Sequence, residues 1–181
     1  MAFLGLFGRK RHERAGFALY TQAVRSARAP YFYAELAVPD TIDGRFDMIG
    51  LYVCLLIERL RREQEPGPAL AQAVFDAMFS DMDHMLRERG VSDMALARKV
   101  RAMWEALHGR GQAYAAALDS GDQAALAAAL ARNVWRGAPV GDGPARLAEI
   151  ALRERGMLES QSLADLRAGR VVFGQAEAVA A

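Results

Sequence analysis

One stretch constrains the fold of this chain more than any other: FDMIGLYVCLLIERLRRE, which begins at Phe46. Between Phe46 and Ile57 every residue except Asp47 is apolar or small, so no side of a helix formed here would be polar. A helix that is apolar all round is buried in the core of its protein. The content of β-branched residues is low, which favours a helix over a strand. The sequence therefore predicts a central helix around which the remaining elements pack.

The rest of the chain also follows a helical period. Phe17, Tyr20 and Val24 recur at the spacing of an amphipathic helix over residues 13–28, and Pro30 ends that helix. We expect an all-α fold, a single-domain bundle of about seven to eight helices over residues 13–168, with tails at 1–12 and 169–181. The further helices expected, with an interruption at HGRG (108–111), are 31–37, 73–89, 93–107, 112–121, 123–137, 145–156 and 162–169.

Composition narrows the class of protein. The formal net charge of +1 provides no overall attraction for nucleic acid, and a single cysteine, Cys54, excludes an intramolecular disulfide. No apolar run reaches the roughly 20 residues that a membrane helix needs. We expect a cytoplasmic protein. Near the N-terminus, FLGLFGRKR suits a weak peripheral contact with an anionic inner-membrane surface; a tail without structure is the alternative.

Acidic residues crowd into AVFDAMFSDMDHMLRERGVSD, which begins at Ala73. On a helix, Asp76 and Asp83 lie about 100° and 80° from Phe75, on one flank of the apolar face, whereas Asp81 and Glu88 lie on the other flank, at about 240° and 220°. The carboxylates are thus divided and cannot chelate one ion from a regular helix. The spacing predicts an i, i+4 ion pair between Asp83 and Arg87.

Known catalytic motifs are not found in this sequence. The chain has no phosphate-binding G-x-x-x-x-G-K-[ST] and no G-x-S-x-G. Cys54 is expected to be a packed thiol, His84 a solvated side chain opposite the apolar face, and His108 a residue at a helix C-terminus. Helical spacing places Met78, Met82, Met85 and Met103 in the core, the alternative being a surface that binds a client. We expect no metal and no cofactor.

Two blocks of sequence, YAELAVPDTIDGRFD and FDAMFSDMDHMLRERGVSD, closely resemble the ubiquinol–cytochrome c chaperone family. The resemblance covers roughly residues 13–155. The family pattern falls on Tyr33, Val38, Pro39, Asp40, Thr41, Gly44, Arg45, Phe46 and Asp47, and on Asp76, Phe79, Asp81, Met82, Asp83, Leu86, Arg87, Glu88, Gly90, Val91 and Asp93.

The resemblance implies a non-enzymatic assembly chaperone for respiratory complex III. Its implied partner is newly made cytochrome b or another complex III subunit, together with a small assembly-factor partner. Two other functions are weighed: a Mg²⁺-dependent enzyme of the acid-rich helical kind, and a haem-handling protein with His84 or His108 as ligand. The first needs carboxylates at adjacent helical positions facing one cavity, which the division of the acids disfavours.

Specific residues carry the expected contacts. The turn VPDTIDGRFD, with Pro39, Asp40, Thr41 and Asp43, is a candidate partner-binding surface; the alternative is that it only launches the central helix, with Asp40 or Asp43 as the cap. Arg45 is expected to meet Asp76 and Asp83 at the rim of the core. Asp81 and Glu88 would then be available to solvent or to a partner. The structural ion-pair candidates are Arg45, Asp76, Asp83 and Arg87.

Overall fold

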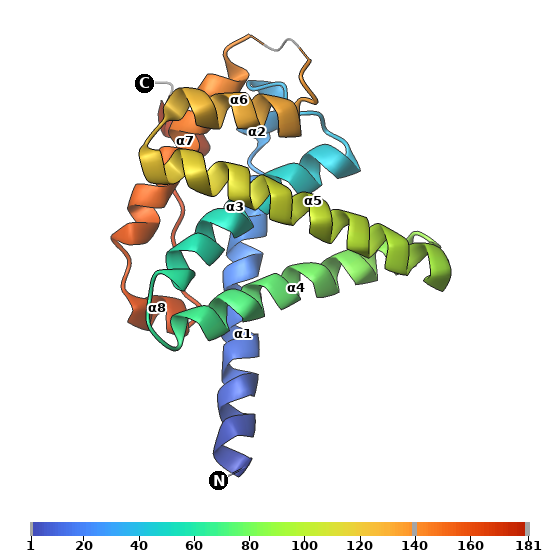
Figure 1. Cartoon of the computed structure of the whole chain (residues 1–181), viewed down its shortest axis with the longest axis vertical. Helices are drawn as coiled ribbons and strands as arrows, with labels where there is room; N and C mark the ends of the chain where they lie inside the picture. Colours follow the sequence, from blue (N-terminus) through green and yellow to red (C-terminus); the bar gives the residue numbers. More distant parts are fainter. Residues whose placement is uncertain (1, 139–140, 180–181) are drawn as a thin grey trace.

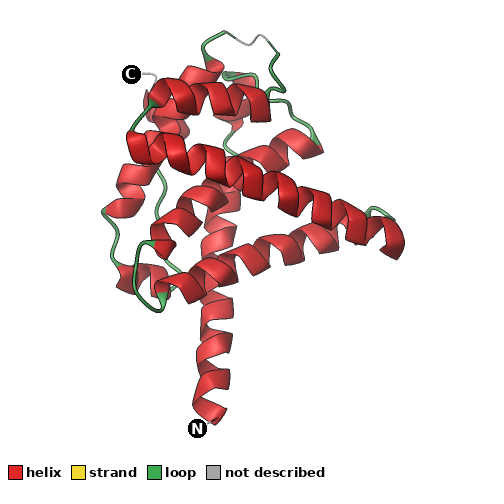
Figure 2. Cartoon of the chain, viewed as in Figure 1, coloured by secondary structure: helices red, strands yellow, loops and turns green. Residues whose placement is uncertain are grey.

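A computed structural model of the chain describes residues 2–138 and 141–179, and the side chains of 10–138 and 141–177. The described chain is helical, with no strand, and forms one bundle (Figures 1 and 2). The elements are α1 (Ala2–Ala27), α2 (Pro30–Ala34), α3 (Ile42–Arg61), α4 (Gly67–Glu88), α5 (Asp93–Ser120), α6 (Gln123–Val134), α7 (Gly143–Glu159), α8 (Leu163–Arg167) and a 3₁₀ turn, η1 (Ala176–Val179). The all-α prediction is confirmed.

The predicted central helix is α3. It contacts α1, α4, α5, α6 and α7, and its Met48, Val53 and Leu56 side chains have no exposed surface. Its N-cap is Thr41, whose hydroxyl oxygen accepts a hydrogen bond from the Gly44 amide at 3.1 Å. The expectation that Asp40 or Asp43 caps this helix is therefore wrong, because the Thr41 hydroxyl occupies that role.

Helix α1 packs along α4 and then extends beyond it (Figure 1). The crossing is close at Gly16, where a Cβ would lie 2.6 Å from the Ala73 backbone carbonyl carbon. Helix α1 begins at Ala2, so the segment expected to be a tail, residues 1–12, is helical from its second residue. The expected membrane contact falls on side chains of residues 3–9, which lie outside the described side chains, and on Lys10 and Arg11, which are exposed. No helix in the described ranges is long and apolar enough to cross a bilayer.

Helix α5 runs unbroken for 28 residues, so the predicted interruption at HGRG is wrong. The glycines here shape packing. A Cβ at Gly111 would lie 3.3 Å from the Cys54 sulfur of α3, whereas Gly109 has nothing within 4 Å of that position. The backbone of α5 can thus approach α3 closely, and that tertiary contact outweighs the low intrinsic helix propensity of two glycines.

The C-terminal segment packs against the bundle instead of fraying, which corrects the expectation of a tail at 169–181. Val171 and Ala176 are buried, and the Phe173 ring lies edge-on to Tyr52, with ring centroids 5.1 Å apart. The Gly174 amide donates to Oε2 of the fully buried Glu154 at 2.8 Å. The segment is therefore anchored to α3 and α7 by both apolar and polar contacts.

Candidate functional site

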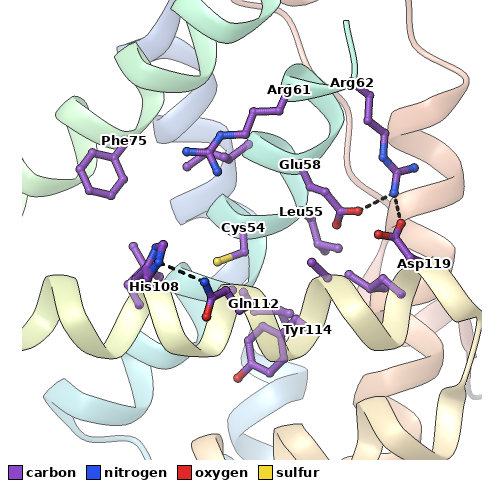
Figure 3. A pocket seen from close by; sticks show the side chains of 16 residues that line it. Cys54, Leu55, Glu58, Arg61, Arg62, Phe75, His108, Gln112, Tyr114 and Asp119 are labelled. Carbon is purple, nitrogen blue, oxygen red and sulfur yellow. Dashed lines mark hydrogen bonds and ion pairs between the residues drawn. The ribbon is translucent and has the colours of Figure 1, made fainter.

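A cavity of about 310 Å³ opens between α3, α4 and α5. Its walls are mainly apolar: Leu51, Cys54, Leu55 and Ile57 from α3, Phe75 from α4, and Leu107 and Leu118 from α5. Figure 3 shows Cys54 directed from α3 toward α5, and Phe75 facing them from α4. We call this cavity the α3–α5 groove. Its size and lining are typical of a binding site.

At one end of the α3–α5 groove, the charged residues of the rim are joined by hydrogen bonds and ion pairs. Arg62 donates to Glu58 at 2.5 Å and also to Asp119 of α5, as Figure 3 shows. Burial raises the pKa of the Glu58 carboxyl, an effect that Arg62 opposes. Arg155 of α7 donates to Asp119 at 3.1 Å, so three helices meet in this network. The network links α3, α5 and α7 at the end of the groove.

The opposite rim is formed by the exposed face of α5. The amide nitrogen of Gln112 lies 3.2 Å from Nε2 of His108, and the Trp104 ring stacks on the His108 ring, with the centroids 5.4 Å apart. Trp104 is 45% exposed. His108 lies inside a continuous helix, and the prediction that it ends a helix is therefore wrong.

Cys54 lacks the properties of a nucleophile. Burial raises the pKa of its thiol to about 12, so the thiolate is a negligible fraction at neutral pH. The sequence prediction that this residue is a packed thiol agrees with that environment.

Buried residues and hydrogen bonds fix the backbone next to the exposed turn before α3. Leu36 and Val38 are buried, and the Trp135 indole donates to the carbonyl oxygens of Leu36 and Ala37 at 3.2 and 3.0 Å. The candidate partner-binding residues of this turn are all exposed: Pro39, Asp40, Thr41 and Asp43. The structure therefore presents them to solvent on a fixed backbone.

The predicted pairing of Arg45 with Asp76 and Asp83 is wrong. Arg45 instead bonds to Asp40 at 2.6 Å, within its own turn. Asp76 accepts from Gln72 at 2.7 Å, one helical turn away. Asp83 pairs with Arg87 at 2.7 Å, which confirms the i, i+4 prediction. These acids pair locally because partners one turn away or within the same loop need no tertiary approach.

Asp81 and Glu88, on the other flank of the helix, also have bonding partners. Asp81, expected to be available to a partner, accepts a 2.6 Å hydrogen bond from the Tyr20 hydroxyl of α1, which corrects that expectation. Burial, and then this bond, raise the pKa of Tyr20. Glu88 lies 3.2 Å from Nε2 of His84, and both side chains are exposed. The Tyr20–Asp81 bond thus adds a polar contact between α1 and α4.

A buried ionic cluster is the main feature that sequence reasoning missed. The Asp47 side chain of α3 has no exposed surface, and it bonds to Arg110 of α5 and, at 2.8 Å, to Arg136 after α6. The signal was present: Asp47 is the single charge within an otherwise apolar helix, and a charge in a core requires partners. Arg110 lies within α5 and Arg136 lies after α6, so their convergence on Asp47 was not visible in the sequence.

The pH dependence of stability should report this cluster. Burial, opposed by Arg110 and Arg136, raises the pKa of Asp47 from 3.8 to about 6. A carboxyl whose pKa is higher in the folded state stabilises the fold below its unfolded pKa and loses that contribution as the pH rises through the folded value. The free energy of unfolding should therefore fall, for this group, between about pH 4 and pH 6. Urea titrations of the wild type and Asp47→Asn across that range check it, and a difference between the two proteins that stays constant with pH contradicts it.

The acidic side chains of the described residues are not grouped as the ligands of a metal ion would be. Across residues 2–138 and 141–179, no group of three or more His, Cys, Asp or Glu side chains could hold a metal ion. Asp76, Asp81 and Asp83 are each bonded to a different residue. Met78 and Met82 are buried in the core, as their spacing predicts.

The described site is an apolar groove with a charged rim on an all-helical scaffold, and grooves of this kind are one way in which domains bind helices of other proteins. The match to the ubiquinol–cytochrome C chaperone family covers residues 34–173, and the chain belongs to this family. The matched segment begins later and ends later than the resemblance at roughly 13–155.

Two relatives extend the comparison. The chain is 26% identical over 120 residues to ubiquinol-cytochrome-c reductase complex assembly factor 1 of Xenopus laevis, a match that covers 66% of this chain and 60% of that protein's length. The crystal structure of the Cbp3 homolog from Brucella abortus superimposes with a TM-score of 0.85 at 36% identity, over 97% of this chain and 98% of that one. The structural likeness therefore extends over almost the whole chain.

Proposed function

We propose that this chain is a non-enzymatic assembly chaperone for the ubiquinol–cytochrome c reductase complex and acts on newly made cytochrome b. The observation that carries the proposal is membership of the chaperone family over residues 34–173. The relative from Xenopus laevis is named as an assembly factor of the same complex. A chaperone of this kind needs a stable scaffold and binding surfaces rather than a nucleophile or a metal.

Two surfaces suit the two partners that such a chaperone requires. The α3–α5 groove has apolar walls of the kind that accept an apolar client helix through side chains spaced at i, i+3 and i+7. The exposed turn with Pro39, Asp40, Thr41 and Asp43 is a rigid polar surface on the same domain, which suits a small assembly-factor partner. The proposal thus assigns the client to the groove along α3 and the partner to the turn at the N-terminal end of this helix.

Deletion of the gene for this chain tests the proposed function. We expect the b-haem absorbance of membranes and the quinol–cytochrome c reductase activity to fall together, because unassembled cytochrome b is lost without its chaperone. Expression of the intact chain from a plasmid should restore both. Normal values of both quantities in the deletion strain would contradict the proposal.

A further inference from the structure

The charged side chains that line the α3–α5 groove differ in whether they form hydrogen bonds or ion pairs. Glu58, Arg62 and Asp119 bond to one another at one end. Arg61 also lines the groove and is exposed, yet within the described part of the chain it makes no hydrogen bond and no ion pair. Figure 3 shows its guanidinium extending over the groove, between Phe75 and Glu58. The groove therefore has at its mouth one arginine, Arg61, that is not bonded to a carboxylate of the described residues.

Part of the groove lining consists of small residues. Cys54 of α3 lies against Gly111 of α5, where a Cβ would be 3.3 Å from the sulfur, and Ala115 follows Gly111 one turn later on the same lining. Small side chains at i and i+4 permit a second helix to approach closely. The space above them is thus suited to the bulky apolar side chains of an incoming segment.

The polar groups of the rim decide which backbone conformation fits. Gln112 is bonded to His108, and Glu58, Arg62 and Asp119 are bonded to one another. An extended peptide would bring unpaired N–H and C=O groups against apolar walls, at a cost for each buried group. A helix satisfies these groups internally. The groove therefore favours a helical occupant.

We infer that the α3–α5 groove binds an amphipathic helix that carries an acidic side chain beside its apolar face, and that Arg61 pairs with that carboxylate. The inference deepens the proposed function, on which it rests, because it states the chemistry of the client segment. A guanidinium forms charge-assisted, bidentate bonds with a carboxylate, and the apolar surroundings strengthen the pair relative to one in water. Arg61 thus selects among apolar helices, which the groove walls alone cannot distinguish.

Binding of designed helices to the purified full chain tests the inference. The probe is a fluorescein-labelled amphipathic peptide with leucines at i, i+3, i+4 and i+7 and one glutamate beside them, compared with the same peptide carrying glutamine or lysine. Fluorescence anisotropy gives each dissociation constant. We expect the glutamate peptide to bind about 10-fold more tightly than the glutamine peptide, because only the carboxylate can form a charge-assisted bond with Arg61.

Variants of the chain assign that preference to Arg61. Arg61→Gln should abolish the difference between the peptides, and Arg61→Glu should reverse it in favour of lysine. Arg98→Gln, at an exposed arginine of α5 that does not line the groove, is the matched control and should leave it unchanged. Ala115→Leu, which fills the groove, should weaken all three peptides, with the circular dichroism spectrum as the check of folding.

Several outcomes would overturn the inference. Equal binding of the three peptides by the wild type would contradict the pairing of Arg61 with an acidic side chain. Unchanged binding to Ala115→Leu would contradict the groove as the binding site. Displacement of the glutamate peptide by phosphatidylglycerol vesicles at stoichiometric lipid, with no preference among the peptides, would show that Arg61 meets lipid phosphate instead. An impaired deletion strain together with charge-independent peptide binding would overturn this inference and leave the proposed function standing.

Discussion

Replacing Asp47 by alanine should lower the free energy of unfolding by about 3 kcal/mol. The carboxylate is fully buried and bonds to Arg110 and Arg136, and its removal leaves the arginines without their acceptor. The Arg110 side chain is only 18% exposed, whereas that of Arg136 is 49% exposed. Most of the cost therefore comes from Arg110, because Arg136 can turn to water. Urea unfolding followed by circular dichroism at pH 7 measures the effect.

Two further substitutions separate the buried charge from a general effect of mutating α3. Asp47→Asn retains a carbonyl acceptor for Arg110 and should cost less than the alanine variant. Asp43→Ala removes an exposed acid from the first turn of the same helix and should change stability by no more than about 1 kcal/mol. Equal losses for Asp47→Ala and Asp43→Ala would mean that the cluster contributes nothing specific.

Gly44→Ala should destabilise the protein by about 1–3 kcal/mol, the usual range for overpacking. Gly44 is buried in the first turn of α3, and a Cβ there would overlap the carbonyl oxygen of Pro39. That carbonyl accepts a hydrogen bond from the Thr41 amide at 2.8 Å, so the turn cannot move away without losing it. The Thr41 cap and the exposed residues beside it would shift together. Thermal unfolding followed by circular dichroism gives the loss.

Gly109→Ala is the matched control for the substitution at Gly44. It makes the same chemical change inside a helix, at a position where a Cβ would have nothing within 4 Å. Alanine is the better helix former by up to about 1 kcal/mol, so this variant should be as stable as the wild type or more stable. A loss equal to that of Gly44→Ala would indicate that helix glycines in general matter here, and not the contact with Pro39.

Much of the fold could be predicted because it depends on local pattern. The apolar run from Phe46 to Ile57 identified the central helix, since a segment without a polar side has only one stable location. The helix ends predicted at residues 89, 123 and 145 lie within two residues of those observed at Glu88, Gln123 and Gly143, because capping involves residues within one turn of each other. Family membership was likewise contained in the two sequence blocks.

The partners of the charged residues were not predictable in the same way. Asp83 and Arg87 pair within one helix, and their spacing alone gave the bond. Asp81 bonds to Tyr20, 61 residues earlier, and Asp47 to Arg110, 63 residues later. Such contacts depend on which helix faces cross, and the pattern of one helix does not contain that information.

Patterns within the sequence were enough to predict an all-α bundle around α3 and to identify the family of the chain. Only the tertiary contacts explain why α5 continues through Gly109 and Gly111, why two arginines enclose Asp47, and why Arg61, among the described residues, lies over an apolar groove without a bonded partner. The difference arises from the separation along the chain between the residues that interact. Helical periodicity and capping act within one or two turns, whereas the packing of α3 against α4 and α5 brings together residues that are far apart in the chain, and the groove exists only where those surfaces fail to meet.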